Sequence, residues 1–239
     1  MFFRCEVAVL MLALTLDGQV HTGEVIGGRE AQAHSRPYMV LLQRHMQDSR
    51  IKHCGGFLLS EDYVMTAAHC QAKTFNVLLG LHDIHNRVDV QSLSVEQSFP
   101  HKGYNVTDLR NDIMLLKLSS KAQINNNVNP IALAGQDDFG LPESCSVSGW
   151  GRTENSPYMS VKLMEVNVTL IEDQRCPKQR FYCSEGETGP GEGDSGGPLV
   201  CEGMAYGVVS GKRKTTSKYT KIPDYRDWAD CVMKNKAKC

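Results

Sequence analysis

The sequence lacks a strong net charge, a long apolar run and a high content of aromatic residues. Its 239 residues hold 26 Lys and Arg against 27 Asp and Glu, which gives a formal net charge of −1. A nearly neutral chain has no overall field that would gather nucleic acid or an anionic membrane, and we expect neither as a partner. With 41% hydrophobic and 22% charged residues, the composition is still typical of a globular protein.

The only extended apolar run stands near the start of the chain. Residues 7–16, VAVLMLALTL, follow the positive charge of Arg4. This run has the length of a signal-peptide core, and about half of the roughly 20 residues that a membrane-spanning helix needs. We therefore predict a signal peptide over residues 1–22, cleaved after Thr22, and a secreted protein without a membrane span.

The cysteines fit an oxidising compartment. There are nine, and with Cys5 in the predicted signal peptide an even number remains. Zinc is the alternative for a stretch such as His53-Cys54, but no C-x-x-C or H-x-x-x-H spacing occurs, so we expect disulfides and no metal. In a secreted chain, the sequons at Asn105 and Asn167 predict N-linked glycans.

Short β-type runs alternate with turn-forming residues along most of the chain. Examples are YMVLLQ (38–43), FNVLLG (75–80), LMEVNVTLI (163–171) and AYGVVS (205–210). This pattern predicts an all-β fold with an antiparallel sandwich or barrel. A helix is predicted only at the end, over about 224–236, where apolar residues recur at three and four positions after Pro223. Residues 119–129 are the most linker-like.

Three motifs suggest nucleophilic catalysis. They are TAAHC (66–70), NDIMLLKL (111–118) and GDSGGPLVC (193–201). Each has an ordinary structural interpretation, with Ser195 in a turn, His69 in the core and Asp112 as a cap. Together, in the order His, Asp, Ser, they resemble the trypsin/chymotrypsin family of serine proteases. An α/β-hydrolase would place the serine first.

The resemblance covers nearly all of the chain from Val25 to the terminal helix. It implies a peptidase domain over 25–239, built from two antiparallel six-stranded β-barrels at about 38–120 and 130–223, and a C-terminal helix. By resemblance, Ser195 is the nucleophile, His69 the general base and Asp112 the group that orients His69. The backbone N–H groups of Gly193 and Ser195 would form the oxyanion hole.

The stretch Gly23-Glu24-Val25-Ile26-Gly27-Gly28 resembles the activation site of the granzyme, mast-cell protease, cathepsin G and duodenase branch. In that branch a dipeptidyl peptidase removes a two-residue propeptide inside secretory granules. The resemblance implies that the freed amine of Val25 then pairs with Asp194. A buried ammonium and a buried carboxylate are tolerated only as a pair.

The same resemblance implies the disulfides Cys54–Cys70, Cys145–Cys201 and Cys176–Cys183. Most trypsins have one more bridge beside the specificity pocket, where this chain has Gly191. The pairing of Cys231 and Cys239 stays open, with each other, with another chain, or with neither in a disulfide.

The predicted specificity pocket departs from the family pattern. Gly189 stands at the pocket floor, where trypsins have an aspartate, so a preference for Lys or Arg is not expected. Ser210, Gly211 and Lys212 would form a wall. The basic stretch 212–214 would either read an acidic substrate residue or form a solvated loop. An uncharged floor favours a large apolar side chain.

The resemblance implies a monomeric endopeptidase that acts on proteins or peptides and is blocked by protein protease inhibitors. It needs no cofactor. Calcium is not expected, since Leu81 replaces the first carboxylate of the loop that binds it in relatives. Sulphated glycosaminoglycan is a weak candidate partner of the basic residues 212–214, 234, 236 and 238. The alternative function is a catalytically weak or inactive binding protein on the same scaffold.

Overall fold

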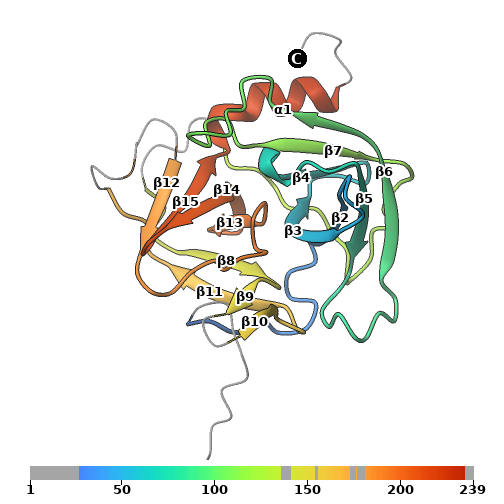
Figure 1. Ribbon diagram of the computed structural model, residues 1–239, viewed down its shortest axis with the longest axis horizontal. Helices are drawn as coiled ribbons and strands as arrows, with labels where there is room; N and C mark the ends of the chain where they lie inside the picture. Colours follow the sequence, from blue (N-terminus) through green and yellow to red (C-terminus); the bar gives the residue numbers. More distant parts are fainter. Residues whose placement is uncertain (1–26, 136–140, 154–155, 173–175, 177–180, 235–239) are drawn as a thin grey trace, which may run out of the picture.

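The computed structural model describes residues 27–135, 141–153, 156–172, 176 and 181–234. Almost all their regular structure is β-strand, arranged as two adjoining halves with one α-helix at their edge (Figure 1). The predicted all-β class with a terminal helix is therefore confirmed. Among these described residues, no helix has both the length and the apolar character needed to cross a membrane.

The first half is a closed barrel in the order β2-β3-β4-β7-β6-β5. Along β2, Val40 and Leu42 point into the barrel core, whereas Met39 and Leu41 pack into a second cluster. This alternation is the two-residue period of a strand buried on both faces. The strands are β2 (Met39–His45), β3 (Ile51–Leu58), β4 (Tyr63–Thr66), β5 (Thr74–Leu79), β6 (Gln91–Pro100) and β7 (Met114–Leu118).

The second half is a seven-stranded sheet in the order β1-β11-β8-β13-β14-β15-β12. It differs from the predicted six-stranded barrel because β1 (Arg29–Glu30) adds a strand beside β11 (Met164–Val168). An isolated antiparallel bridge between Leu170 and Ser184 brings the other six strands back upon themselves. The remaining strands are β8 (Cys145–Gly149), β12 (Phe181–Glu185), β13 (Pro198–Cys201), β14 (Met204–Arg213) and β15 (Thr216–Lys221).

One hairpin, two 3₁₀ turns and one α-helix complete the regular structure of the described residues. A small hairpin joins β9 (Arg152–Thr153) to β10 (Ser156–Met159), and the 3₁₀ turn η1 (Ala68–Cys70) carries His69. The predicted terminal helix begins later than expected, because Pro223–Tyr225 forms the 3₁₀ turn η2 before α1 (Arg226–Met233). Residues 235–239 lie outside the described part.

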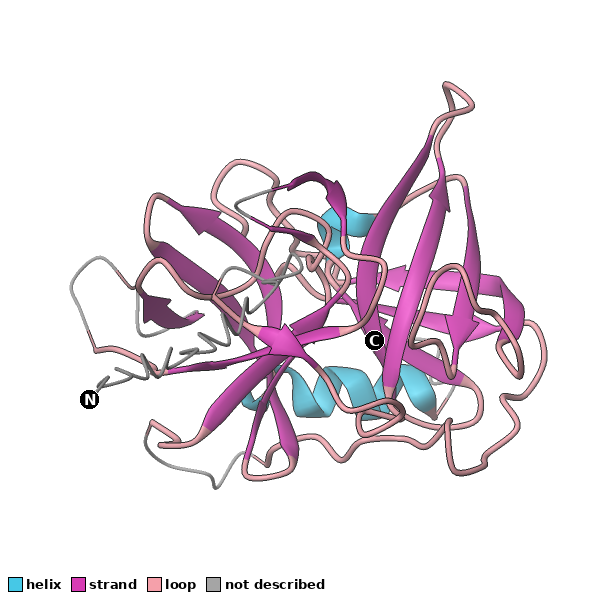
Figure 2. Ribbon diagram, turned by 90° about the horizontal axis from the view of Figure 1, so that it is seen from below, coloured by secondary structure: helices cyan, strands magenta, loops and turns pink. Residues whose placement is uncertain are grey.

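The helix and the connection between the halves both belong to the first barrel's core. Ala229 and Val232 of α1 are buried in the same cluster as β2–β7, and Figure 2 shows the helix lying along one side of the strands. The linker-like segment 119–129 also packs there through buried Ala122 and Val128.

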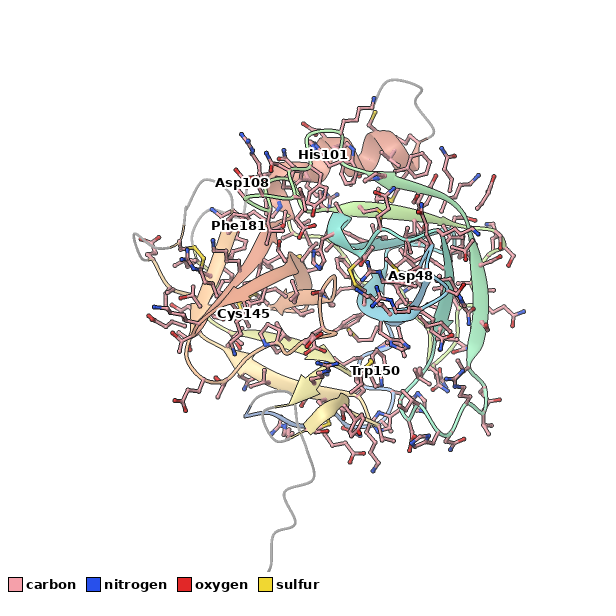
Figure 3. All side chains as sticks on the ribbon, in the orientation of Figure 1. Asp48, His101, Asp108, Cys145, Trp150 and Phe181 are labelled. Carbon is pink, nitrogen blue, oxygen red and sulfur yellow. A yellow bond between two sulfur atoms is a disulfide. The ribbon has the colours of Figure 1, made fainter. Side chains whose placement is uncertain are left out.

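The two halves meet at the buried side chain of Trp150. Its ring packs with Met39, Leu41 and Leu78 of the barrel and with Leu163 beside β11. Its indole N–H donates to the carbonyl of His82 at 3.0 Å, and Figure 3 labels it where the strands of the two halves converge. This interface helps to fix how the barrel faces the sheet.

Candidate active site

Asp112 is fully buried, and its carboxylate is surrounded by donors. Its Oδ1 accepts a hydrogen bond from the backbone N–H of His69 at 2.9 Å, and its Oδ2 lies 2.7 Å from His69 Nδ1. The hydroxyl of Ser210 donates to the same Oδ2 at 2.5 Å. This arrangement holds the His69 ring with Nδ1 on the acid, which leaves Nε2 for another partner.

The backbone of His69 is braced on both sides. Besides the N–H bond to Asp112, its carbonyl accepts a hydrogen bond from Arg44 Nη2 at 3.1 Å. The adjacent Cys70 is disulfide-bonded to Cys54 of β3. The side chain of His69 is 25% exposed, so a substrate can still reach the imidazole.

Ser195 lies in a loop that is tied to both halves of the fold. Its carbonyl accepts from the N–H of Gly55 in β3 at 2.8 Å, and the next N–H, of Gly196, donates to Val209 of β14 at 2.8 Å. Gly196 has φ +85°, and a Cβ there would lie 2.1 Å from Thr66 Oγ1. Only glycine permits this close approach.

Asp194 is also buried and accepts two backbone hydrogen bonds. Gly151 N–H donates to its Oδ1 at 2.7 Å, and Gly191 N–H donates to its Oδ2 at 2.8 Å. Burial raises the pKa of this carboxyl to about 6, although the two amides act in the opposite direction. Val25, its predicted partner, lies outside the described residues.

The peptide between Glu192 and Gly193 has a fixed orientation. The carbonyl of Glu192 accepts a hydrogen bond from the N–H of Arg152 at 2.6 Å. In a trans peptide the N–H points opposite to the carbonyl, so the N–H of Gly193 faces away from Arg152. Gly193 has φ +106°, which strongly favours glycine.

His69 and Ser195 line one cleft of about 500 Å³ between the two halves. The Cys54–Cys70 side of the cleft comes from the barrel, and the opposite side comes from the second half. The other lining residues are Arg44, Ile51, Lys52, His53, Cys54, Arg152, Tyr158, Met159, Glu192 and Gly193. The structure thus brings the predicted base, nucleophile and oxyanion-hole glycine together.

The predicted pocket residues lie elsewhere. Gly189 is buried, and a Cβ on it would stand 3.4 Å from the hydroxyl of Ser217 in β15. Gly211 and Lys212 continue β14 and pair with β15 across a tight hairpin. Lys212 is exposed, as are residues 213 and 214 at the hairpin end. None of these residues lines the 500 Å³ cleft.

Three features of the site were not anticipated from the sequence. Ser210, expected as a pocket wall, is buried with its hydroxyl on Asp112. Gly151 binds Asp194 through its backbone, for which the Gly149-Trp150-Gly151 run is the only sequence signal. The contact of Arg44 with His69 has no sequence signal, because a backbone carbonyl accepts the bond.

The three disulfides implied by the resemblance are present, joining Cys54 to Cys70, Cys145 to Cys201 and Cys176 to Cys183. Cys231 is also disulfide-bonded, whereas Cys239 lies outside the described residues. The sulfurs of Cys54 and Cys70 and a nitrogen of His69 approach within 4.8 Å. Two sulfurs joined to each other are not thiolates, so this cluster is not a metal site.

The two sequons are reachable at the surface. Asn167 is exposed on β11, and Asn105 is half-buried with its side-chain oxygen on the N–H of Thr107 at 2.8 Å. The predicted signal peptide (1–22) and activation dipeptide (23–24) lie outside the described residues.

This fold and cleft define the class of chymotrypsin-like serine proteases, and comparison with known proteins agrees. A family profile described as Trypsin matches residues 25–229, so the chain belongs to the trypsin family of serine endopeptidases. Its relatives include granzyme B of Rattus norvegicus, 39% identical over 245 residues, which cover 96% of this chain and 99% of the relative.

Two further relatives narrow the branch. Chymase of Papio hamadryas is 38% identical, covering 93% of this chain and 96% of its own. Mast cell protease 8 of Mus musculus is 37% identical, over 95% of this chain and 96% of the relative. A solved structure described as "Structure of GrC" superposes with a TM-score of 0.83 at 34% identity, covering 88% of this chain and all of that one. The chain thus lies among granzyme-like and chymase-like members.

Proposed function

We propose that the protein is a secreted or granule-stored serine endopeptidase that cleaves peptide bonds through an acyl-enzyme intermediate. The observation that carries this proposal is the Asp112–His69 contact of 2.7 Å at the edge of a cleft shared with Ser195. A buried carboxylate on Nδ1 keeps Nε2 free to accept the serine proton and stabilises the imidazolium that results.

In the proposed reaction, Ser195 Oγ attacks the substrate carbonyl and its proton passes to His69 Nε2. The oxyanion that forms accepts hydrogen bonds from the N–H groups of Gly193 and Ser195. His69 then gives the proton to the leaving amine as the C–N bond breaks. Water, activated by the same histidine, hydrolyses the ester on Ser195 and releases the second product.

Activation is proposed to follow removal of Gly23-Glu24 by a dipeptidyl peptidase. The freed ammonium of Val25 would join Asp194, whose carboxylate already accepts two amide hydrogen bonds. That pair would stabilise the loop between Gly191 and Ser195, including the Gly193 amide. Storage in granules is proposed from the granzyme and mast cell protease relatives.

The proposed specificity is non-tryptic. The predicted pocket floor consists of Gly189 with Ser217 nearby and supplies no carboxylate for a Lys or Arg side chain. Burial of a large apolar side chain, from the residue before the scissile bond, would stabilise substrate binding in such a pocket by about 1.5–3 kcal/mol. The exposed positions of Lys212 and Lys214 favour the solvated-loop interpretation. We also propose that the enzyme is a monomer and that protein protease inhibitors block it.

The second candidate, a binding protein without activity, is favoured by one observation. The hairpin between β14 and β15 is tight, with Arg213 paired directly to Thr216, and this leaves little chain to build a deep pocket. A weak glycosaminoglycan contact would involve the exposed residues 212–214 and 234, whereas 236 and 238 lie outside the described residues.

To separate these candidates, the chain would be produced with Val25 as its free N-terminus and exposed to a diverse peptide mixture. Mass spectrometry would identify cleaved bonds, with the Ser195→Ala protein as control. Cleavage after aromatic residues or leucine supports the apolar pocket, and cleavage after Asp or Glu assigns the basic hairpin to specificity. A folded protein that cleaves nothing contradicts the endopeptidase proposal and supports the binding protein.

A further inference from the structure

The cleft beside Ser195 contains a buried cation that the proposed reaction does not use. Arg44 of β2 is 8% exposed, and its Nη2 donates to the carbonyls of His69 and Gln71, both at 3.1 Å. Its Nη1 contacts the sulfur of Cys54 at 3.4 Å. Arg44 Nε is buried without a hydrogen-bond partner among the residues that the structure describes. A buried charge that is bound only by neutral acceptors is costly, so a carboxylate partner would be favourable.

Lys52 adds one further positive charge beside this arginine, because it is paired with Arg44 across β2 and β3. Lys52 and His53 of the neighbouring strand β3 line the same cleft, and Lys52 is exposed. Burial, together with the charges of Arg87 and Arg44, lowers the pKa of His53. The lowered pKa, caused mainly by burial, favours the neutral imidazole of His53, so the positive charge of this wall comes from Arg44 and Lys52.

The nearby carboxylates are already paired with other cations. Glu192, on the opposite wall, binds Arg152 Nη1 through its Oε2 at 2.6 Å. Asp48, in the turn after β2, binds Arg50 at 2.5 Å. Among the described residues, neither carboxylate is therefore left to neutralise Arg44, and the Cys54–Cys70 wall of the cleft keeps a net positive charge.

This wall can be assigned to one side of the scissile bond. The cleft holds His69 and Ser195, yet none of the predicted pocket residues Gly189, Gly211 and Lys212. Those residues would receive the side chain before the bond. The cleft with Arg44 is therefore available to the part of the substrate that leaves as the amine product.

We propose that Arg44 and Lys52 form an anion-binding subsite for a carboxylate side chain of the substrate, within the three residues that follow the scissile bond. This proposal rests on the endopeptidase function and adds to it a class of substrate. Ile51 and Tyr158, 54% and 77% exposed, flank the cleft and offer apolar contacts to the neighbouring substrate residues.

The test uses the protein with Val25 as its N-terminus and a set of peptides that share one cleavable bond. The three residues after the bond are varied one at a time among Glu, Gln and Lys, and the peptides compete in one mixture. Because a hydrogen-bonded charge pair is stronger than its neutral counterpart, we expect kcat/KM for Glu to exceed that for Gln by about tenfold at one of these positions. Lys should be the poorest.

The variants Lys52→Gln and Lys52→Glu test the assignment without touching the catalytic residues. The first should reduce the Glu-over-Gln ratio severalfold, and the second should turn the preference toward Lys. Lys234→Gln, which removes an exposed lysine beyond α1, is the matched control and should leave the ratio unchanged. Arg44→Met should reduce the Glu-over-Gln ratio more strongly than Lys52→Gln. If Arg44→Met does not fold, the Lys52 variants still test the subsite.

Cleavage with equal rates for Glu, Gln and Lys at all three positions would overturn the subsite while leaving the endopeptidase proposal intact. A preference for Glu that survives in Lys52→Glu and Arg44→Met would also overturn it. Absence of any cleavage by the folded parent is a different result, because it contradicts the proposed function itself.

Discussion

Arg152 and Glu192 are joined twice, once through the backbone and once through their side chains. The N–H of Arg152 donates to the carbonyl of Glu192 at 2.6 Å, and the guanidinium contacts the Glu192 carboxylate at 2.6 Å. The backbone bond orients the peptide whose N–H belongs to Gly193. Strand β9, which begins at Arg152, thereby positions the N–H of Gly193, one of the two proposed oxyanion donors.

The first prediction separates these two links. Arg152→Gln and Glu192→Gln remove the side-chain pair but keep the backbone bond. Because the two side chains are 48% and 74% exposed, their pair contributes about 0–1 kcal/mol. We expect kcat to fall less than about fivefold in steady-state assays. A loss of a hundredfold in either variant would show that the side chains, not the backbone, hold the oxyanion hole.

The second prediction concerns Gly193→Ala. The positive φ of +106° is strained for alanine, and the new Cβ would lie 3.1 Å from the Cα of Gly151. The Gly193 amide should shift, and we expect kcat to fall about a hundredfold with KM changing less. Gly203→Ala is the matched control, since it also has a positive φ but meets no atom within 4 Å. Equal kcat losses in both variants would contradict the assigned role.

The third prediction is for Ser210→Ala. This change removes one donor from the buried carboxylate of Asp112, which still accepts two hydrogen bonds from His69. Loss of a hydrogen bond to a charged group costs about 1.5–3 kcal/mol, so we expect kcat/KM to fall by at least about tenfold. Ser148→Ala, at another buried serine, is the control for general effects on packing. An unchanged pH–rate profile and kcat/KM would reject the positioning role of Ser210.

The fourth prediction uses the pH dependence of stability to test the activation proposal. In the form that retains Gly23-Glu24, the folded-state pKa of Asp194 is raised to about 6 from a usual value of 3.8. Between pH 4 and 6 the folded state then binds more protons than the unfolded one. The contribution of Asp194 to the free energy of unfolding therefore falls as pH rises through this window.

Once Val25 is freed, an ammonium partner would lower the pKa of Asp194 instead. The contribution of Asp194 to the free energy of unfolding would then be present above pH 4 and lost as pH falls further. Stability would therefore rise with pH in this region instead of falling. Denaturant unfolding of both forms, each with Ser195→Ala to prevent self-cleavage, measures the difference. The Asp194→Asn variant should remove the contribution in either form. Identical pH dependence of the two forms would argue against the Val25–Asp194 pair.

Much of the fold and of the candidate site can be predicted from the sequence, because the relevant signals are local. Alternating apolar residues and turn residues define the strands, and the motifs around His69, Asp112 and Ser195 are short and specific. The disulfides Cys54–Cys70, Cys145–Cys201 and Cys176–Cys183 follow from the family resemblance. The seventh strand, β1, was missed because two exposed residues, Arg29 and Glu30, carry no alternating pattern.

The sequence by itself determined the family and the all-β class, and it supplied the three residues of the proposed catalytic triad. Only the tertiary structure decided which backbone groups meet. Arg44 reaches the carbonyl of His69 within the barrel half, and Gly151 reaches Asp194 within the second half, because segments distant in the chain fold back beside one another. Such contacts join residues far apart in the chain through main-chain atoms that all amino acids share, and no residue pattern can encode their partners.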